Sequence, residues 1–165
     1  MSSRGLFAGV LCTVALAWCA LGCDPGSIND GPLTLDDGGT FICVPETAPA
    51  GDGHHNEGQA CLTSGCHRNS GGPAFTVAGT VYDIKKNGLT VPGATIVVID
   101  GDGKEVRIPT AQNGNFWTSE PVSPPLYVRA SQCPNDRRMV SLSQDGDCNA
   151  GQCHSAAEDR IFLYE

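Results

Sequence analysis

The chain has 165 residues, of which 40% are hydrophobic, and its formal net charge is −8. This length suits one compact domain. The negative charge argues against nucleic acid as a partner, because the phosphates would be repelled, and against electrostatic docking on an anionic membrane. The 21 glycines and 11 prolines favour short strands and many turns over long helices.

Residues 1–22 are predicted to be a targeting signal. Arg4 precedes the apolar run LFAGVLCTVALAWCALG, which ends at Cys23 and is short for a membrane-spanning helix. The stretch ALGC resembles a bacterial lipoprotein signal, which implies cleavage before Cys23 and a lipid on that thiol. The mature protein would then lie in the cell envelope, anchored to a membrane on its periplasmic or cell-surface side. An ordinary secretory signal and an uncleaved anchor are the alternatives.

Residues 23–60 contain few apolar side chains and many turn formers, so they are expected to be an acidic, flexible tether. The packed domain is expected over residues 61–165, with its core between 74 and 130. After removal of the signal and the lipid-bearing Cys23, six of the nine cysteines remain. Outside the cytoplasm disulfides persist. Six cysteines suit three disulfides, or one disulfide and two thiol pairs bound to something else.

Short strands are predicted from residue 75 onward, because apolar residues alternate between turn signals. The β-branched stretch ATIVVID (94–100) is expected to be a central strand, and DGDG (100–103) a turn into a hairpin partner. No segment has a helical period. We therefore predict an all-β fold, an antiparallel sandwich of about seven strands. Its core is expected to contain Phe75, Val77, Val81, Ile96, Val98, Phe116, Leu126 and Val128.

Three glycine-containing patterns follow one another along these strands: Gly79 with Val81, Gly93-Ala94 with Ile96 and Val98, and Thr110 with Gly114 and Phe116. Their order resembles the carboxypeptidase regulatory-like domain. The resemblance implies an Ig-like sandwich of the transthyretin type, with loop-rich, cysteine-containing flanks here. It says little about function, because this module usually serves as a scaffold.

Two motifs of the form C-x4-C-H flank the predicted sandwich: CLTSGCH (61–67) and CNAGQCH (148–154). In c-type haem attachment two cysteines hold the vinyl groups and the next histidine binds the iron, usually as C-x-x-C-H. Tetrahaem cytochromes of sulfate-reducing bacteria use the longer C-x4-C-H form. The contexts HNEGQAC and GDCNAGQCH also resemble bacterial multihaem lipoproteins in which such motifs stand before and after a carboxypeptidase-like sandwich.

This resemblance implies two haem c groups, one on Cys61 and Cys66 and one on Cys148 and Cys153. The implied iron ligands are His67 and His154, with His55, or else His54, and Met139 as further candidates. Met139, in the stretch RRMVSL, also suits a strand position facing the core, which is the favoured interpretation. The remaining pair, Cys43 and Cys133, would then form one disulfide. The protein would transfer electrons to redox partner proteins or envelope components.

Two other interpretations of the cysteines stay open. Each C-x4-C could close a small disulfide loop, which would make the protein a disulfide-stapled binding or structural module. Zinc is the third, although reduced cysteine clusters are disfavoured in an oxidising compartment. No nucleophile or phosphate-loop motif occurs, so no enzymatic activity is predicted.

Overall fold

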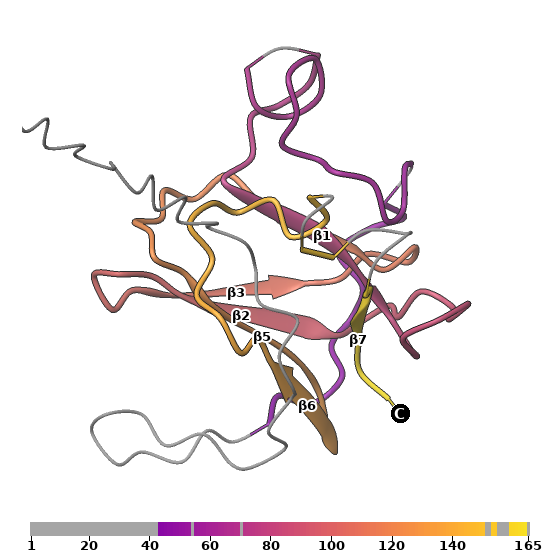
Figure 1. Ribbon diagram of the computed structural model, residues 1–165. Helices are drawn as coiled ribbons and strands as arrows, with labels where there is room; N and C mark the ends of the chain where they lie inside the picture. Colours follow the sequence, from indigo (N-terminus) through magenta and orange to yellow (C-terminus); the bar gives the residue numbers. More distant parts are fainter. Residues whose placement is uncertain (1–42, 54, 70, 151–152, 155–158, 165) are drawn as a thin grey trace, which may run out of the picture.

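Figure 1 shows the computed structural model, which describes residues 43–165 except 54, 70, 151–152, 155–158 and 165. The described residues form strands and turns and contain no helix. The predicted signal, the predicted lipidation site Cys23 and the first part of the expected tether lie outside them. The strands are β1 (Val77–Tyr82), β2 (Thr95–Ile99), β3 (Glu105–Pro109), β4 (Asn115–Thr118), β5 (Tyr127–Gln132), β6 (Asn135–Arg138) and β7 (Ile161–Phe162).

The strands form two sheets that pack as a sandwich, which confirms the predicted fold class (Figure 1). One sheet has the order β4-β1-β7 and the other β3-β2-β5-β6. All pairings are antiparallel except that of β1 with the short β7, which is parallel. Among the described residues, no helix is long and apolar enough to cross a membrane.

Strand β2 lies in the middle of the four-stranded sheet, as its β-branched sequence predicts. Ile96 lies opposite Ile108 and Val98 opposite Val106, so cross-strand apolar pairs face the core. The turn into β3 is fixed by the Asp100 carboxylate, which accepts hydrogen bonds from the backbone of Asp102 and Lys104. The predicted DGDG hairpin is therefore confirmed.

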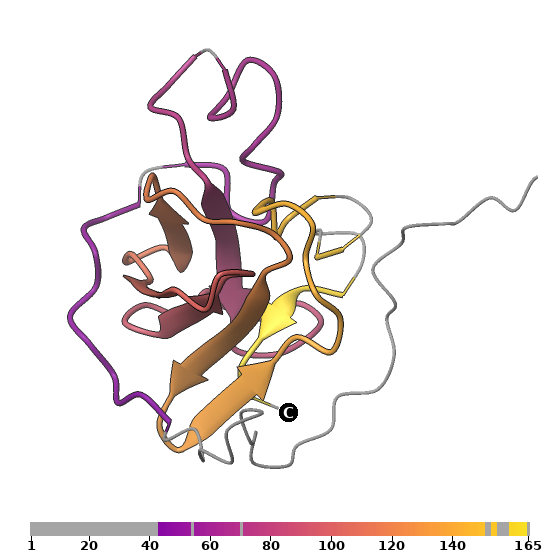
Figure 2. The ribbon, with the colours of Figure 1, turned by 90° about the vertical axis from the view of Figure 1, so that its left-hand side faces the viewer.

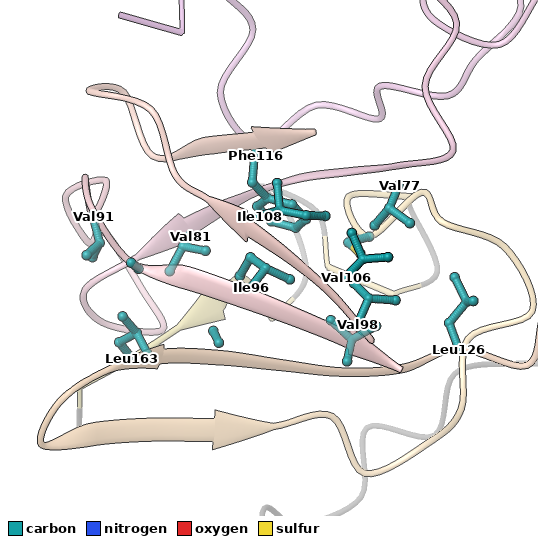
Figure 3. Packing of buried hydrophobic residues seen from close by; sticks show 14 residues of the cluster. Val77, Val81, Val91, Ile96, Val98, Val106, Ile108, Phe116, Leu126 and Leu163 are labelled. Atoms are coloured by element: carbon teal, nitrogen blue, oxygen red, sulfur yellow. The ribbon is translucent and has the colours of Figure 1, made fainter. Parts of the chain in front are cut away.

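The core lies between the sheets and takes side chains from both of them (Figure 3). The predicted core residues are buried with the exception of Phe75. Phe75 was predicted to face inward because it alternates with Val77. It stands before β1 begins, however, and its half-buried ring stacks on His67 with centroids 4.1 Å apart.

Strand β1 is buried on both faces, so a second layer covers the outer side of its sheet. Thr80 shows how this layer is fixed, since its side chain is fully buried and points away from the core residues Val77 and Val81. Its hydroxyl accepts hydrogen bonds from the Gly58 amide (2.9 Å) and from the Asn149 side chain (3.0 Å). The flanking loops that carry the two cysteine motifs therefore cover β1.

The packed part of the chain begins well before residue 61, which corrects the expected boundary of the tether. Thr47 and Ala50 donate backbone hydrogen bonds to Gly93 and Thr110. In Figure 2 this indigo-to-purple segment runs along the left side of the sandwich. The segment is polar, but backbone hydrogen bonds need no apolar side chains, so composition alone did not reveal its packing.

The predicted disulfide between Cys43 and Cys133 is present, with an S–S distance of 2.07 Å and a Cα–Cα distance of 5.5 Å. It joins the start of the described chain to the turn between β5 and β6. A hydrogen bond from the Cys133 amide to the Val44 carbonyl lies beside it. Residues 43–44 are thereby fixed to the four-stranded sheet.

Candidate functional site

The two cysteine motifs fold with the same backbone hydrogen bond. In the first motif (residues 61–67) the His67 amide donates to the Cys61 carbonyl at 3.1 Å. In the second motif (residues 148–154) the His154 amide donates to the Cys148 carbonyl at 3.2 Å. The shared spacing thus closes the same loop twice and places each histidine beside the first cysteine of its motif.

The two histidine rings are also held alike. Nδ1 of His67 lies 2.8 Å from the Pro73 carbonyl oxygen, and Nδ1 of His154 lies 2.7 Å from the Asp159 carbonyl oxygen. A carbonyl can only accept, so in the neutral ring Nδ1 carries the proton and Nε2 the lone pair. Burial lowers the pKa of His154, which favours the neutral ring that binds metal ions. Each motif therefore offers an oriented Nε2 ligand.

The thiols of the two motifs differ in exposure. In the first motif Cys66 is exposed and Cys61 is half-buried, while Cys148 of the second motif belongs to the hydrophobic core. Burial, with smaller contributions from Asp147 and Cys66, raises the pKa of Cys61 to about 11. Burial likewise raises the pKa of Cys148 to about 12.

Neither motif closes a small disulfide of its own. Cys61, Cys66 and Cys148 are free thiols, and Cys153 is disulfide-bonded. The two-loop interpretation of the sequence therefore does not describe this structure. The first motif keeps both thiols available for another bond.

The residues on either side of Cys148 hold the first motif in place. Oδ1 of Asp147 accepts a hydrogen bond from the Cys61 amide (3.1 Å), and Oδ2 accepts one from the Leu62 amide (2.9 Å). The Asn149 side chain donates to the Gln59 carbonyl at 3.1 Å. The two motifs thus lie side by side over β1, although 86 residues separate Cys61 from Asp147.

Sequence reasoning missed Asp147 and Asn149. Residues 147–150 form a turn, in which the Ala150 amide donates to the Asp147 carbonyl at 3.1 Å. Strand alternation therefore does not mark the two side chains, and no local pattern in the sequence reveals their contacts.

An aromatic row leads away from the first motif. The ring of His67 lies between those of His55 and Phe75, with centroid distances of 6.0 and 4.1 Å. Phe75 in turn lies 6.0 Å from Trp117 of β4. The structure therefore brings the candidate ligand His55 to the first motif. The motif itself lies in the loop that projects at the top of Figures 1 and 2.

The other candidate ligand, Met139, lies elsewhere. Its side chain packs partly buried against the core, and its amide donates to the Val128 carbonyl of β5. A thioether that fills core space is an ordinary use of methionine. Met139 therefore packs against the core of the sandwich.

A small pocket of about 220 Å³ borders the first motif. Its lining includes the apolar side chains of Leu62, Phe75 and Leu126 and the charged side chains of Arg68 and Asp145. The described residues contain no group of three or more histidine, cysteine or carboxylate side chains that could hold a metal ion. A zinc site built from four protein ligands is therefore not found in the described part of the chain.

No family model, no curated protein and no solved structure matches this chain. The resemblances to the carboxypeptidase regulatory-like domain and to multihaem lipoproteins therefore stay predictions.

Proposed function

We propose that this protein is a lipid-anchored, c-type cytochrome-like electron carrier of the cell envelope, with two covalently bound haems and no enzymatic activity of its own. The observation that carries the proposal is the repeated geometry of the two motifs. Each ends in a histidine whose Nδ1 is held by a backbone carbonyl, so that Nε2 is free to bind iron. Two unrelated disulfide loops would not need this arrangement.

The first motif holds the donor groups that a haem c would use. Cys61 and Cys66 are free thiols, and a pocket lined in part by Leu62 and Phe75 borders the same loop. His67 would hold the iron, and His55, whose ring centroid lies 6.0 Å from that of His67, is the candidate second ligand.

The second motif would take a haem under two conditions. Covalent attachment needs two thiols, so Cys153 would have to be reduced, whereas it is disulfide-bonded here. Cys148 lies in the core and is only 5% exposed, so its sulfur would have to react before the chain folds. The Asp159 carbonyl orients the ring of His154, and burial lowers the pKa of His154, which favours the neutral form.

A bound haem would supply one-electron oxidation and reduction of its iron. The chain itself would hold the sulfurs, orient the two histidines and keep the motifs adjacent through Asp147. Redox partner proteins or other envelope components would exchange the electrons. The acidic surface would select basic partner surfaces, and the lipid on Cys23 would keep the protein at the membrane.

Intact mass after denaturation tests the proposal. The mature chain should be made in a host that attaches haem c, and its mass measured with and without reductant. Two thioether-bound haems add about 1.2 kDa that reductant does not remove, with a Soret band in the visible spectrum. A chain without that mass and without the band would contradict the proposal.

A disulfide-stapled binding or structural module is the second candidate. The bonded state of Cys153 and the Cys43–Cys133 disulfide favour it. The aromatic row of His55, His67, Phe75 and Trp117 would then be a surface for a protein or glycan ligand. The free thiols of Cys61 and Cys66 argue against this candidate, because a disulfide-stapled module would pair them.

Membrane attachment has its own test. Cys23→Ser should release the protein from the membrane fraction, because the lipid would be its anchor. A variant that stays membrane-bound and uncut would show that residues 1–22 are an uncleaved anchor instead.

A further inference from the structure

Asp147 is fixed by the sandwich itself. Its backbone forms a parallel bridge with Ala78 of β1, and the next amide, that of Cys148, donates to the Ala78 carbonyl at 3.0 Å. The residue is only 5% exposed. The backbone from which its carboxylate extends is therefore held by β1.

The first motif has little support of its own. Leu62 is its one buried residue, and residues 63–66 are exposed. Two consecutive amides, those of Cys61 and Leu62, donate to the two oxygens of Asp147. A carboxylate that accepts from two amides forms charge-assisted hydrogen bonds, which are stronger and more directional than neutral ones.

Asn149 acts further upstream. Its side chain reaches the Gln59 carbonyl and both the amide and the hydroxyl of Thr80. It holds the approach to the motif against β1 but does not touch Cys61. Asp147 is thus the residue that fixes the backbone of the first attachment cysteine.

We propose that Asp147 is the positioning residue of the first motif, so that a side chain adjoining the second motif decides whether Cys61 and Cys66 take up their haem. This inference rests on the proposed function. Its consequence is an asymmetry between the motifs: the backbone of the first motif is held by Asp147, whereas Cys148 of the second motif is held by β1 and the core.

The test is Asp147→Asn, which keeps the shape of the side chain. The carboxamide has one acceptor oxygen where the carboxylate had two, and its NH2 group would face an amide donor. In a host that attaches haem c, we expect at least a tenfold loss of haem from the peptide containing Cys61 and Cys66. The peptide containing Cys148 and Cys153 should keep its haem.

Two further variants complete the comparison. Asp102→Asn makes the same chemical change in the exposed β2–β3 turn and should leave both haems in place. The double variant Cys148→Ser, Cys153→Ser keeps Asp147 and should lose only the second haem. If Asp147→Asn retains the first haem, or loses both haems together, Asp147 does not position the first motif.

Amide hydrogen exchange of the haem-free chain separates this inference from the proposed function. The Cys61 and Leu62 amides should exchange at least tenfold faster in Asp147→Asn than in Asp102→Asn, while the amides of β2 stay protected. Unchanged exchange would overturn the positioning role. A wild-type chain that takes up no haem would overturn the proposed function, and the exchange rates would still decide the role of Asp147.

Discussion

The two C-x4-C-H motifs have the same spacing and the same closing hydrogen bond, yet their surroundings differ. The first lies in a loop that projects beyond the sandwich, with Cys66 exposed. The second lies against β1, with Cys148 in the core. The comparison shows that the spacing of the motif determines its local turn, whereas the contact with β1 determines how exposed each thiol is to solvent.

The cause of the difference is the room available above β1. Gly79 has no side chain, and a Cβ built there would lie 3.0 Å from the Cβ of Cys148 and 2.6 Å from the ring of Phe116. Cys148 therefore takes the place that a larger residue in β1 would fill. The first motif is joined to the same strand through Asp147, which bridges to Ala78 and accepts a hydrogen bond from the Leu62 amide.

Thiol labelling gives the largest expected contrast between the motifs. In the haem-free, folded chain at pH 8, iodoacetamide should label Cys66 first, Cys61 far more slowly and Cys148 only after unfolding. The thiolate is the reacting form, and pKa values of about 11 and about 12 leave Cys61 and Cys148 almost entirely protonated. Peptide mass mapping over time measures the order. Labelling of Cys148 as fast as that of Cys66 would contradict the difference in burial.

Removal of the Cys43–Cys133 disulfide should lower the free energy of unfolding without altering the order in which the thiols are labelled. The bond joins residues 90 positions apart, and closing so long a loop is worth about 4 kcal/mol. The double variant Cys43→Ser, Cys133→Ser should lose that amount in urea unfolding. Its order of thiol labelling should match the wild type, because the bond anchors residues 43–44 to the other sheet. A changed order of labelling would show that the Cys43–Cys133 disulfide also affects the structure of the two motifs.

The sandwich could be predicted from the sequence because its signals are local. Alternation and β-branched residues marked β2, and DGDG marked its turn. Phe75 was misplaced because alternation continues in the sequence past the point where β1 begins. The packing of residues 44–50 was missed because it rests on backbone hydrogen bonds, which composition does not record.

The candidate site was predictable only in part. The repeated C-x4-C-H spacing identified the cysteines and histidines of the motifs. His55 was also a candidate from the sequence, and it lies beside His67. The contacts that join the motifs, from Asp147 to Cys61 and from Thr80 to Asn149, span 86 and 69 residues. Such contacts arise from the tertiary fold, so no local pattern predicts them.

Thr80→Val tests the shared support of both motifs. The fully buried hydroxyl donates to Asn115 and accepts from Gly58 and Asn149, so valine removes the partner of three buried groups. We expect a loss of about 3 kcal/mol in urea unfolding and faster labelling of Cys61. Thr63→Val, at an exposed position, is the control and should change stability by less than about 0.5 kcal/mol. Equal losses in the two variants would contradict a supporting role for Thr80.

Gly79→Ala should disturb the second motif by a smaller amount. The added methyl group would overlap the ring of Phe116 and press on Cys148, and overpacking of this kind costs about 2 kcal/mol. Cys148 should then be labelled faster, while Cys66 keeps its wild-type rate.

Phe116→Leu in the same chain should recover part of the loss, because a smaller side chain leaves room for the methyl group. In a double-mutant cycle the two changes should therefore cost less together than the sum of their separate costs. Strictly additive costs would mean that Gly79 does not shape the space in which Cys148 and Phe116 meet, and the difference between the motifs would need another cause.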